Sequence, residues 1–288
     1  MKKTYITLIL IATSFTICVA QNTRYNNDSL VKAMRFYYDS IATVKRLDFL
    51  STFDSIPDST AGVFKMSSMN LPDIPEISRL KKVRRLDAPK NKLIKIKAKD
   101  IDIDSLRSLN LSDNELKHIN FPSNSMIKSL DLSGNNFRRI PRSIRKLKHL
   151  TNLTINQNQV NRFSKNRHRI KRIPRFFKKM TNLKSLEINF NKIKLSKRDV
   201  KRLSNIQVLV AAGNDIHILP ENINDLKSIK NLNLSKNHIH KLPANFVLLD
   251  SLQSVIFYKN NFEKIPAEIT SLTNLRIIDF YYNNISEI

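Results

Sequence analysis

The sequence predicts an α/β solenoid, with a curved parallel β-sheet on its concave face and short helices or irregular turns on its convex face. Two observations predict this fold: asparagine recurs at a nearly constant spacing, and the same apolar frame surrounds each asparagine. Six of the eight intervals between these asparagines are 23 residues long. The positions are Asn91, Asn114, Asn135, Asn158, Asn191, Asn214, Asn237, Asn260 and Asn283. This periodicity makes the 288 residues one elongated domain rather than two compact ones.

The apolar frame indicates how each unit is built. Leu232 and Leu234 alternate with polar residues, as in a strand with one buried face, and successive units stack such strands into a parallel sheet. After the turn at Asn237, Phe246 and Leu249 keep a spacing of three that is typical of a short outer helix or irregular turn. Ten units at about 4.8 Å per strand give an inner sheet roughly 50 Å long.

This frame resembles the leucine-rich repeat, L-x-x-L-x-L-x-x-N-x-L-x-x-I/L-P-x-x-I-x-x-L, in its 23-residue form with a proline after the strand turn. The resemblance covers residues 61–288 and implies about ten repeats in a repeat domain that we place at residues 47–288. The first repeat is degenerate and fits the frame at Ala61, Phe64, Met66, Leu71 and Ile74-Pro75. A further unit that begins at Val44, Leu47 and Phe49 stays an alternative.

Each repeated asparagine has an expected structural role. After a strand the chain turns across the core, so backbone donors and acceptors lose their sheet partners and need others. An asparagine amide holds both a donor and an acceptor and can satisfy them. We therefore assign none of the repeated asparagines to a binding site.

Residues 1–20 have the layout of a secretory signal peptide. Lys2 and Lys3 precede a mostly apolar stretch, and Cys18 and Ala20 offer small residues at the positions typical of cleavage. The stretch is shorter than the ~20 apolar residues of a membrane helix. Lipid attachment at Cys18 is the alternative, although Ile17 is bulky for that processing. We expect a secreted, periplasmic or cell-surface protein without a transmembrane helix in the mature chain.

Both ends of the solenoid need cover, because a repeat array exposes its core there. We assign residues 21–46 to a spacer and a capping helix, with the helix over residues 28–44, where apolar residues gather near one face. The last unit ends just after its turn, at Asn283 and Ile285, so we expect an open edge. Truncation, cover by a partner, and self-association through that edge stay alternatives.

Charge marks a second region of the sequence. The chain holds 50 Lys and Arg against 24 Asp and Glu, and residues 138–202 alone hold 22 basic residues and two acidic ones. The one interval of 33 residues indicates an insertion, which we place at residues 164–173, and inserted loops often carry function. Its candidate polyanion-binding residues are Arg162, Lys165, Arg167, Arg169, Lys171 and Arg172. Anionic glycan, lipid head group and acidic protein surface all suit them. A solvated charged flank is the alternative.

The concave face offers candidate residues for binding a partner. Residues between the core positions of each strand point to that face, and toward the C-terminus they become apolar and aromatic. Such residues supply much of the energy of protein interfaces. The candidates are Val208, Val210, Ile256, Tyr258, Ile277, Tyr281 and Tyr282. The alternative is that they fill ordinary variable positions.

Several kinds of chemistry are excluded or disfavoured. Three glycines cannot supply the glycine loops of dinucleotide and P-loop sites, and one cysteine supplies neither a disulfide framework nor a cysteine zinc site. Serine-hydrolase and H-E-x-x-H patterns are missing from the sequence, so we expect no catalytic residue and no cofactor. His217, His240 and Glu263 share one repeat position, which we interpret as a solvated ladder rather than a metal site. An export signal argues against a nucleic-acid partner.

Two functional hypotheses follow from the sequence. The first is a non-enzymatic, exported scaffold that binds a protein, peptide or glycan through its concave face, while the basic flank favours acidic or polyanionic partners. The second is a surface-associated structural protein that the basic flank holds electrostatically to an anionic envelope. The ligand and the oligomeric state stay open.

Overall fold

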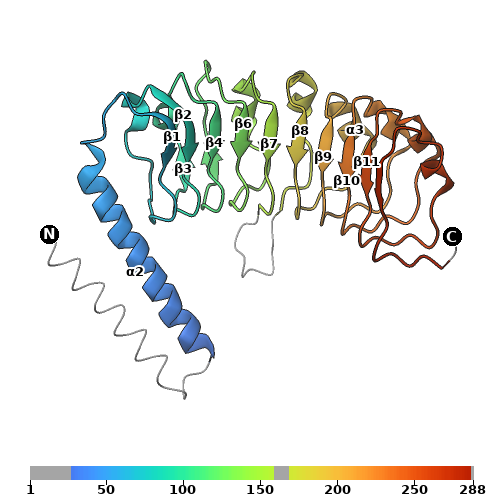
Figure 1. Cartoon of the computed structure of the whole chain (residues 1–288), viewed down its shortest axis with the longest axis horizontal. Coiled ribbons are helices and arrows are strands. Elements are labelled where there is room, and N and C mark those ends of the chain that lie inside the picture. The colour runs from blue at the N-terminus through green and yellow to red at the C-terminus, as the bar shows by residue number, and fades with distance from the viewer. Residues whose placement is uncertain (1–26, 159–168, 287–288) are drawn as a thin grey trace.

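The computed structural model describes residues 27–158 and 169–286 and has the predicted α/β solenoid architecture (Figure 1). Ten parallel strands form one sheet in these residues. A second pair, β3 (Lys95–Ile96) with β5 (His118–Ile119), joins two of the turns. The strands of the main sheet are β1 (Ala61–Lys65), β2 (Lys82–Asp87), β4 (Ser108–Asn110), β6 (Ser129–Asp131), β7 (Asn152–Thr154), β8 (Ser185–Glu187), β9 (Val208–Val210), β10 (Asn231–Asn233), β11 (Ser254–Ile256) and β12 (Ile277–Asp279).

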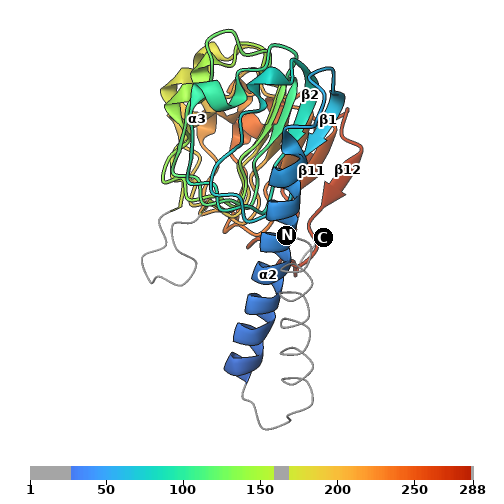
Figure 2. The same cartoon turned by 90° about the vertical axis from the view of Figure 1, so that its left-hand side faces the viewer.

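Short helices cover the side of the solenoid opposite the sheet (Figure 2). From Pro141 onward, the proline of each I/L-P pair stands in extended conformation just before a 3-10 helix. Its carbonyl accepts a hydrogen bond from the backbone N–H of the buried residue three positions on, as Pro243 does from Phe246 at 2.8 Å. The helices are η1 (Ile77–Arg79), η2 (Ala98–Ile101), η3 (Arg142–Lys146), η4 (Arg175–Lys179), α3 (Lys197–Arg202), η5 (Glu221–Asp225), η6 (Ala244–Leu248) and η7 (Ala267–Ile269). The three-residue spacing thus corresponds mainly to 3-10 turns.

The core lies between the sheet and these helices. From β4 to β11 the middle residue of each three-residue strand points inward, as Leu86 does in β2, and the strand register places it beside its equivalent in the next repeat, as with Leu209 and Leu232. Burial of such a side chain contributes about 1.5–3 kcal/mol. The middle residues from β2 to β11 are all buried: Leu86, Leu109, Leu130, Leu153, Leu186, Leu209, Leu232 and Val255.

The repeated asparagines form a continuous ladder of buried amides. Asn237 Nδ2 donates to the carbonyl of Leu234 in its own turn at 2.9 Å and to the carbonyl of Ala211 in the preceding repeat at 3.0 Å. Its Oδ1 accepts from the backbone N–H of Ile216, also in the preceding repeat, at 3.2 Å. The structure confirms that the asparagine satisfies the turn. It also shows that one amide joins two successive repeats.

A left-handed residue precedes each asparagine of the ladder. Gly134 and Gly213 hold this position in two repeats, with φ of 65° and 64°. At Gly213 an added Cβ would lie 2.4 Å from Cδ1 of Phe190, the equivalent residue one repeat earlier, so a side chain fits there only if the ring moves. The remaining repeats place a non-glycine residue in this conformation: Lys90, Asp113, Gln157, Phe190, Lys236, Lys259 and Tyr282.

The N-terminal helix is longer than the sequence predicted. Helix α2 spans Asn27–Phe53, so Leu47 and Phe49 are helical, and both the boundary at residue 47 and the alternative repeat unit there are wrong. The physical reason is that Phe49 and Phe53 pack against Phe64 of β1, with ring centroids 6.2 and 6.3 Å apart, and cover the first repeat. The earlier turns of α2 extend away from the solenoid (Figures 1 and 2).

Polar contacts fix α2 to the first turn. The Arg46 guanidinium donates to the carbonyl of Asn70 at 3.3 Å, and the Asn70 amide donates to the carbonyl of Asp39 at 3.2 Å. The predicted signal peptide, residues 1–20, and the spacer up to residue 26 lie outside the described residues. No helix within residues 27–158 and 169–286 is both long and apolar enough to span a membrane.

At the other end, β12 pairs with β11, and within the described residues no further strand follows it in the sheet. Its middle residue Ile278 is 50% exposed, unlike the buried Val255 beside it.

Replacing Asn237 by alanine will lower the free energy of unfolding by about 3 kcal/mol or more, because it leaves several buried backbone groups without partners. Asn231→Ala, on the exposed side of the neighbouring strand, is the matched control and will change stability by less than about 0.5 kcal/mol. Urea denaturation of the two variants measures the difference. Equal losses of stability would show that the ladder is not what holds the turns.

Candidate functional site

From β2 to β12 the open face of the sheet carries two aligned rows of side chains, from the residues just before and just after the central position of the register. Both rows are polar from β2 to β8 and become partly apolar from β9 onward. The first row is Arg85, Ser108, Ser129, Asn152, Ser185, Val208, Asn231, Ser254 and Ile277. The second row is Asp87, Asn110, Asp131, Thr154, Glu187, Val210, Asn233, Ile256 and Asp279. The strand register therefore confirms that the predicted strand residues share one face.

Three tyrosines form an exposed cluster at the C-terminal end of this face. The ring of Tyr258 lies 6.1 Å from that of Tyr281 and 5.5 Å from that of Tyr282, while Tyr281 and Tyr282 are 4.5 Å apart. Tyr281 is 68% exposed and Tyr282 62% exposed, whereas Tyr258 is half-buried between its neighbours. Edge-on and tilted contacts of this kind hold aromatic rings in a defined arrangement.

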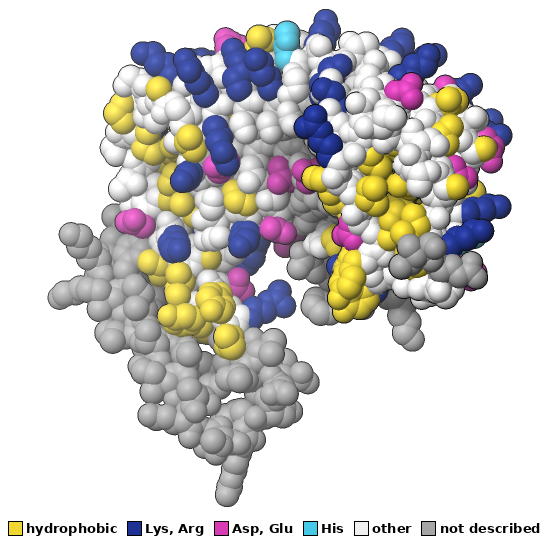
Figure 3. Space-filling model, turned by 45° about the vertical axis from the view of Figure 1, so that its right-hand side comes forward, with side chains coloured by type: hydrophobic (Ala, Val, Ile, Leu, Met, Phe, Trp, Pro, Cys, Tyr) yellow, Lys and Arg dark blue, Asp and Glu magenta, His cyan; other side chains and the backbone are white. Residues whose placement is uncertain are grey.

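The seven concave candidates do not form one continuous patch. Val208 and Val210 belong to β9, and the polar Asn231 and Asn233 of β10 separate them from the residues of β11. Hydrophobic side chains gather at the C-terminal end of the solenoid (Figure 3). We therefore define the apolar patch by five of the seven candidates: Ile256, Tyr258, Ile277, Tyr281 and Tyr282.

The middle of the same face is hollowed and polar. A cleft of about 440 Å³ lies over the ends of strands β6 to β8. Its lining includes the carboxylates of Asp131 and Glu187 and the exposed side of Phe190. Glu187 is one of the two acidic residues in the basic stretch 138–202, and it lies on the sheet face instead of the flank.

The second acidic residue of that stretch, Asp199, makes its contacts within its own turn and helix α3. Its carboxylate accepts from the backbone N–H of Ser196 at 3.0 Å, which starts helix α3, and forms an ion pair with Arg202 at 2.9 Å. Arg202 also donates to the carbonyl of Ile173 at 2.7 Å. One of the two acids thus faces away from the flank and the other offsets a single arginine, so most of the positive charge of the flank is left unneutralised by this stretch.

Two adjacent basic clefts lie on this flank. The first has a volume of about 730 Å³, and among the described residues no acidic one lines it; the second has a volume of about 770 Å³. The segment from Lys171 to Arg175 lines both clefts. The cationic lining of the first is Arg138, Arg139, Arg142, Arg145, Arg169, Lys171, Arg172 and Arg175. The second shares Lys171, Arg172 and Arg175 with it, has Lys192, Lys194, Arg198 and Arg202 in addition, and is also lined by Asp199 and Asp215.

The clefts bring together half of the predicted basic site. Arg169, Lys171 and Arg172 line them, whereas Arg162, Lys165 and Arg167 lie outside the described residues. The flank residues that complete the first cleft, such as Arg142, Arg145 and Arg175, were absent from that candidate set. Their common signal in the sequence is their place around the I-P pair of adjacent repeats, in and beside η3 and η4. Guanidinium groups at this density suit a ligand with several phosphate, sulfate or carboxylate groups.

The histidines pair differently from the predicted column. The ring of His217 stacks on that of His238, with centroids 4.7 Å apart, so its close histidine contact is with a residue outside the predicted column of His217, His240 and Glu263. His217 is three residues after Asn214, and His238 is one residue after Asn237 in the next repeat. These two positions of successive turns are in contact.

Comparison with known proteins supports the interpretation of the repeats. The leucine-rich repeat family matches residues 126–147, which is a single repeat of this chain. An internalin (inlF) from Listeria monocytogenes superposes with a TM-score of 0.57 at 17% identity, covering 80% of this chain and 70% of that chain. The chain has the leucine-rich-repeat fold.

Two further solved structures share this fold. Internalin C2 (inlC2) from Listeria monocytogenes gives a TM-score of 0.52 at 21% identity, covering 68% of this chain and 79% of that chain. The leucine-rich-repeat ectodomain of the plant receptor kinase GASSHO1/SCHENGEN3 from Arabidopsis thaliana, in complex with CASPARIAN STRIP INTEGRITY FACTOR 2, gives 0.55 at 21% identity. That match covers 78% of this chain and 29% of the receptor chain. No curated protein matches the sequence.

Removal of the exposed tyrosines will not unfold the protein. Tyr281→Ala will cost less than about 1 kcal/mol of stability, because its main loss is a ring contact. Phe257→Ala removes a buried ring that contacts Phe246, Phe262 and Phe280, and will cost about 3–5 kcal/mol. Thermal and urea denaturation compare the two. A large loss in Tyr281→Ala would show that the cluster is part of the core.

Proposed function

We propose that this protein is an exported, non-enzymatic scaffold that binds a protein or peptide through the apolar patch on its concave face. The observation that carries the proposal is the tyrosine cluster, in which two of three contacting rings are more than 60% exposed. Aromatic rings that stay exposed to water add little to folding stability. Aromatic residues are, however, enriched among the residues that dominate the binding energy of protein interfaces. The proposal assigns the chain no catalytic residue and no cofactor.

The composition of the patch favours a protein or peptide ligand. Ile256 and Ile277 supply apolar surface beside the tyrosines, and the tyrosine hydroxyls supply hydrogen bonds at the rim. One of the similar solved structures is a receptor ectodomain in complex with another factor, so the same fold supports recognition in that protein. For this chain, we place the contact on the last two strands of the sheet.

The basic clefts are the second part of the proposal. Their positive charge attracts acidic partners at long range and raises association rates, an effect that salt screens. In this role the flank adds affinity for acidic or polyanionic partners, and the apolar patch supplies selectivity. An anionic glycan is one such partner, because its sulfate or carboxylate groups suit the same guanidinium groups.

The second candidate function is attachment to an anionic envelope without a specific concave ligand. The first basic cleft favours it, since its lining within residues 27–158 and 169–286 holds eight cationic side chains and no acidic one. An anionic membrane or polymer surface needs only that charge. The two functions differ in which residues matter and in how strongly salt acts.

We also propose export with removal of residues 1–20. The basic start, the short apolar stretch and the small residues up to Ala20 support it, as does the ectodomain origin of one similar structure. Attachment through a lipid at Cys18 is the alternative route to the cell surface.

Tyr258→Ala combined with Tyr281→Ala will abolish capture of the partner by the immobilised protein, and wild-type capture will persist at about 0.5 M salt. Tyr38→Ala is the matched control, because Tyr38 is as exposed as Tyr282 but lies on α2. Pull-downs from extracellular fractions at two salt concentrations measure both effects. Capture that the double variant leaves unchanged contradicts the first function.

The envelope alternative gives the opposite pattern. It requires binding to vesicles that contain phosphatidylglycerol and not to pure phosphatidylcholine, with loss at about 0.5 M salt. Replacement of Arg169, Lys171 and Arg172 by glutamine will then weaken vesicle binding, while the tyrosine variant will not.

Mass spectrometry of the N-terminus will identify Gln21 as the first residue of the exported protein. A Cys18→Ala variant will be processed in the same way. An N-terminal lipid on Cys18, or export that is lost in Cys18→Ala, contradicts simple cleavage and supports anchoring.

A further inference from the structure

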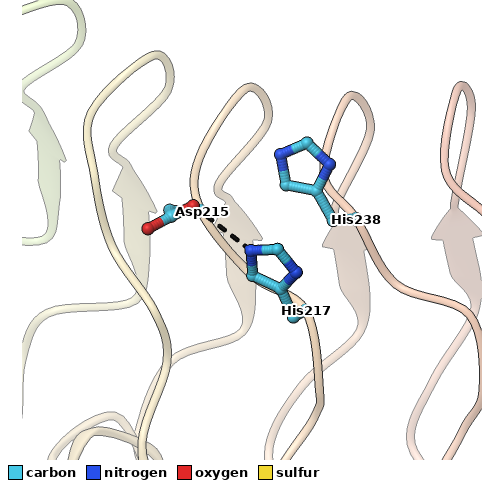
Figure 4. A group of neighbouring side chains, drawn as sticks. All are labelled: Asp215, His217 and His238. Carbon is cyan, nitrogen blue, oxygen red and sulfur yellow. Dashed lines mark hydrogen bonds and ion pairs between the residues drawn. The ribbon is translucent and has the colours of Figure 1, made fainter.

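We propose that Asp215, His217 and His238 form a binding site for a divalent transition-metal ion, Zn²⁺ or Cu²⁺. The three side chains project from the turns that follow β9 and β10, on successive repeats (Figure 4). This inference is independent of the proposed apolar patch, because none of these residues belongs to it, although Asp215 also lines the second basic cleft.

The geometry places three ligand atoms around one point. The carboxylate Oδ1 of Asp215 lies 3.3 Å from Nε2 of His217, and the ligand atoms of all three residues lie within 4.8 Å of one another. Zinc bonds to nitrogen and carboxylate oxygen are about 2.0–2.2 Å, so ligands of one ion stand roughly 3.3 Å apart. The first pair already has this separation. The His238 ring is exposed, and the proposal requires it to turn toward this pair when an ion binds.

The backbone that carries these side chains is fixed by the asparagine ladder. The N–H of Asp215 donates to the carbonyl of Ile193 at 3.0 Å, and the N–H of His238 donates to the carbonyl of Ile216 at 2.9 Å. Ile216, between Asp215 and His217, is bonded in turn to Asn237 Oδ1. Little backbone entropy therefore remains to be lost when an ion binds, which favours affinity.

The ligand set selects the class of ion. Imidazole nitrogen suits zinc, copper and nickel, whereas magnesium and calcium take mainly oxygen ligands. Three protein ligands leave a tetrahedral ion one free position, which water or a side chain of a partner can fill. All three side chains are at least partly exposed, so an ion reaches them directly from solvent.

One neighbouring charge opposes the ion. The Lys194 ammonium lies 3.6 Å from Oδ2 of Asp215, the carboxylate oxygen that does not face His217. It competes for the carboxylate and repels a cation. Lys194 therefore weakens metal binding at this site. Its removal will raise the affinity for the ion if Asp215 is a ligand, and will have no such effect if His217 and His238 only stack on each other.

Isothermal titration of the full chain with Zn²⁺, and separately with Mg²⁺, tests the proposal. We expect one Zn²⁺ per chain and no heat of binding from Mg²⁺. His217→Ala and His238→Ala will each weaken zinc binding by roughly tenfold or more, whereas Lys194→Ala will strengthen it. His240→Ala is the matched control, because His240 is exposed and holds the repeat position of His217 one unit later.

Circular dichroism of each variant checks that the fold is unchanged, and ring nitrogen shifts of His217 and His238 in NMR spectra identify the ligands. Zinc binding that is unchanged in both His217→Ala and His238→Ala overturns the proposal. So does an equal loss in His240→Ala, which would show binding to surface histidines in general. A chain that binds neither Zn²⁺ nor, in the same titration, Cu²⁺ excludes the site.

Discussion

The hydrogen bonds of the buried asparagine amides are the constraint on which the rest of this structure depends. A strand of three residues followed by a sharp turn leaves polar backbone groups inside the molecule. Without hydrogen-bond partners, these groups would lower the stability by an amount comparable to what the buried leucines of the repeat contribute. The amide of Asn237 bonds to its own turn and to the preceding one, so each repeat completes its neighbour. Stability is therefore shared between adjacent units, as in other solenoids.

The ladder also determines where function can lie. It fixes the register of the strands, so residues that are 23 positions apart, such as Asn231 and Ser254, stand side by side on the sheet. Chemical character then changes along the solenoid with the sequence of each repeat. Aromatic rings gather at one end of the sheet face, carboxylates occupy its middle, and guanidinium groups cover the flank. Three surfaces with different chemistry are thus presented by one repeated backbone.

The sequence predicted the features that follow from the repeat period. It did not predict the features that depend on side-chain contacts between different elements. Alternation and asparagine spacing were sufficient for the strands, the buried leucines and the shared face of Ile256 and Ile277. The end of α2 was not predictable, because Val44, Leu47 and Phe49 fit the beginning of a repeat about as well as a helix, and only the contact with Phe64 decides. The meeting of His217 with His238 depends on side-chain directions in two neighbouring turns, which a one-dimensional pattern does not contain. The first basic cleft likewise combines residues from both sides of the insertion.

The sheet continues without a fault across the insertion. Asn152 of β7 pairs with Ser185 of β8, and Thr154 with Glu187, in the same alignment that joins repeats of ordinary length. The chain between those strands is ten residues longer than in a repeat of ordinary length, yet Asn158, Phe177 and Leu183 keep their buried repeat positions in it. Natural variation in length and charge can accumulate there without loss of the fold, and a designer can graft a foreign peptide or a reporter at this one position while the solenoid keeps its shape.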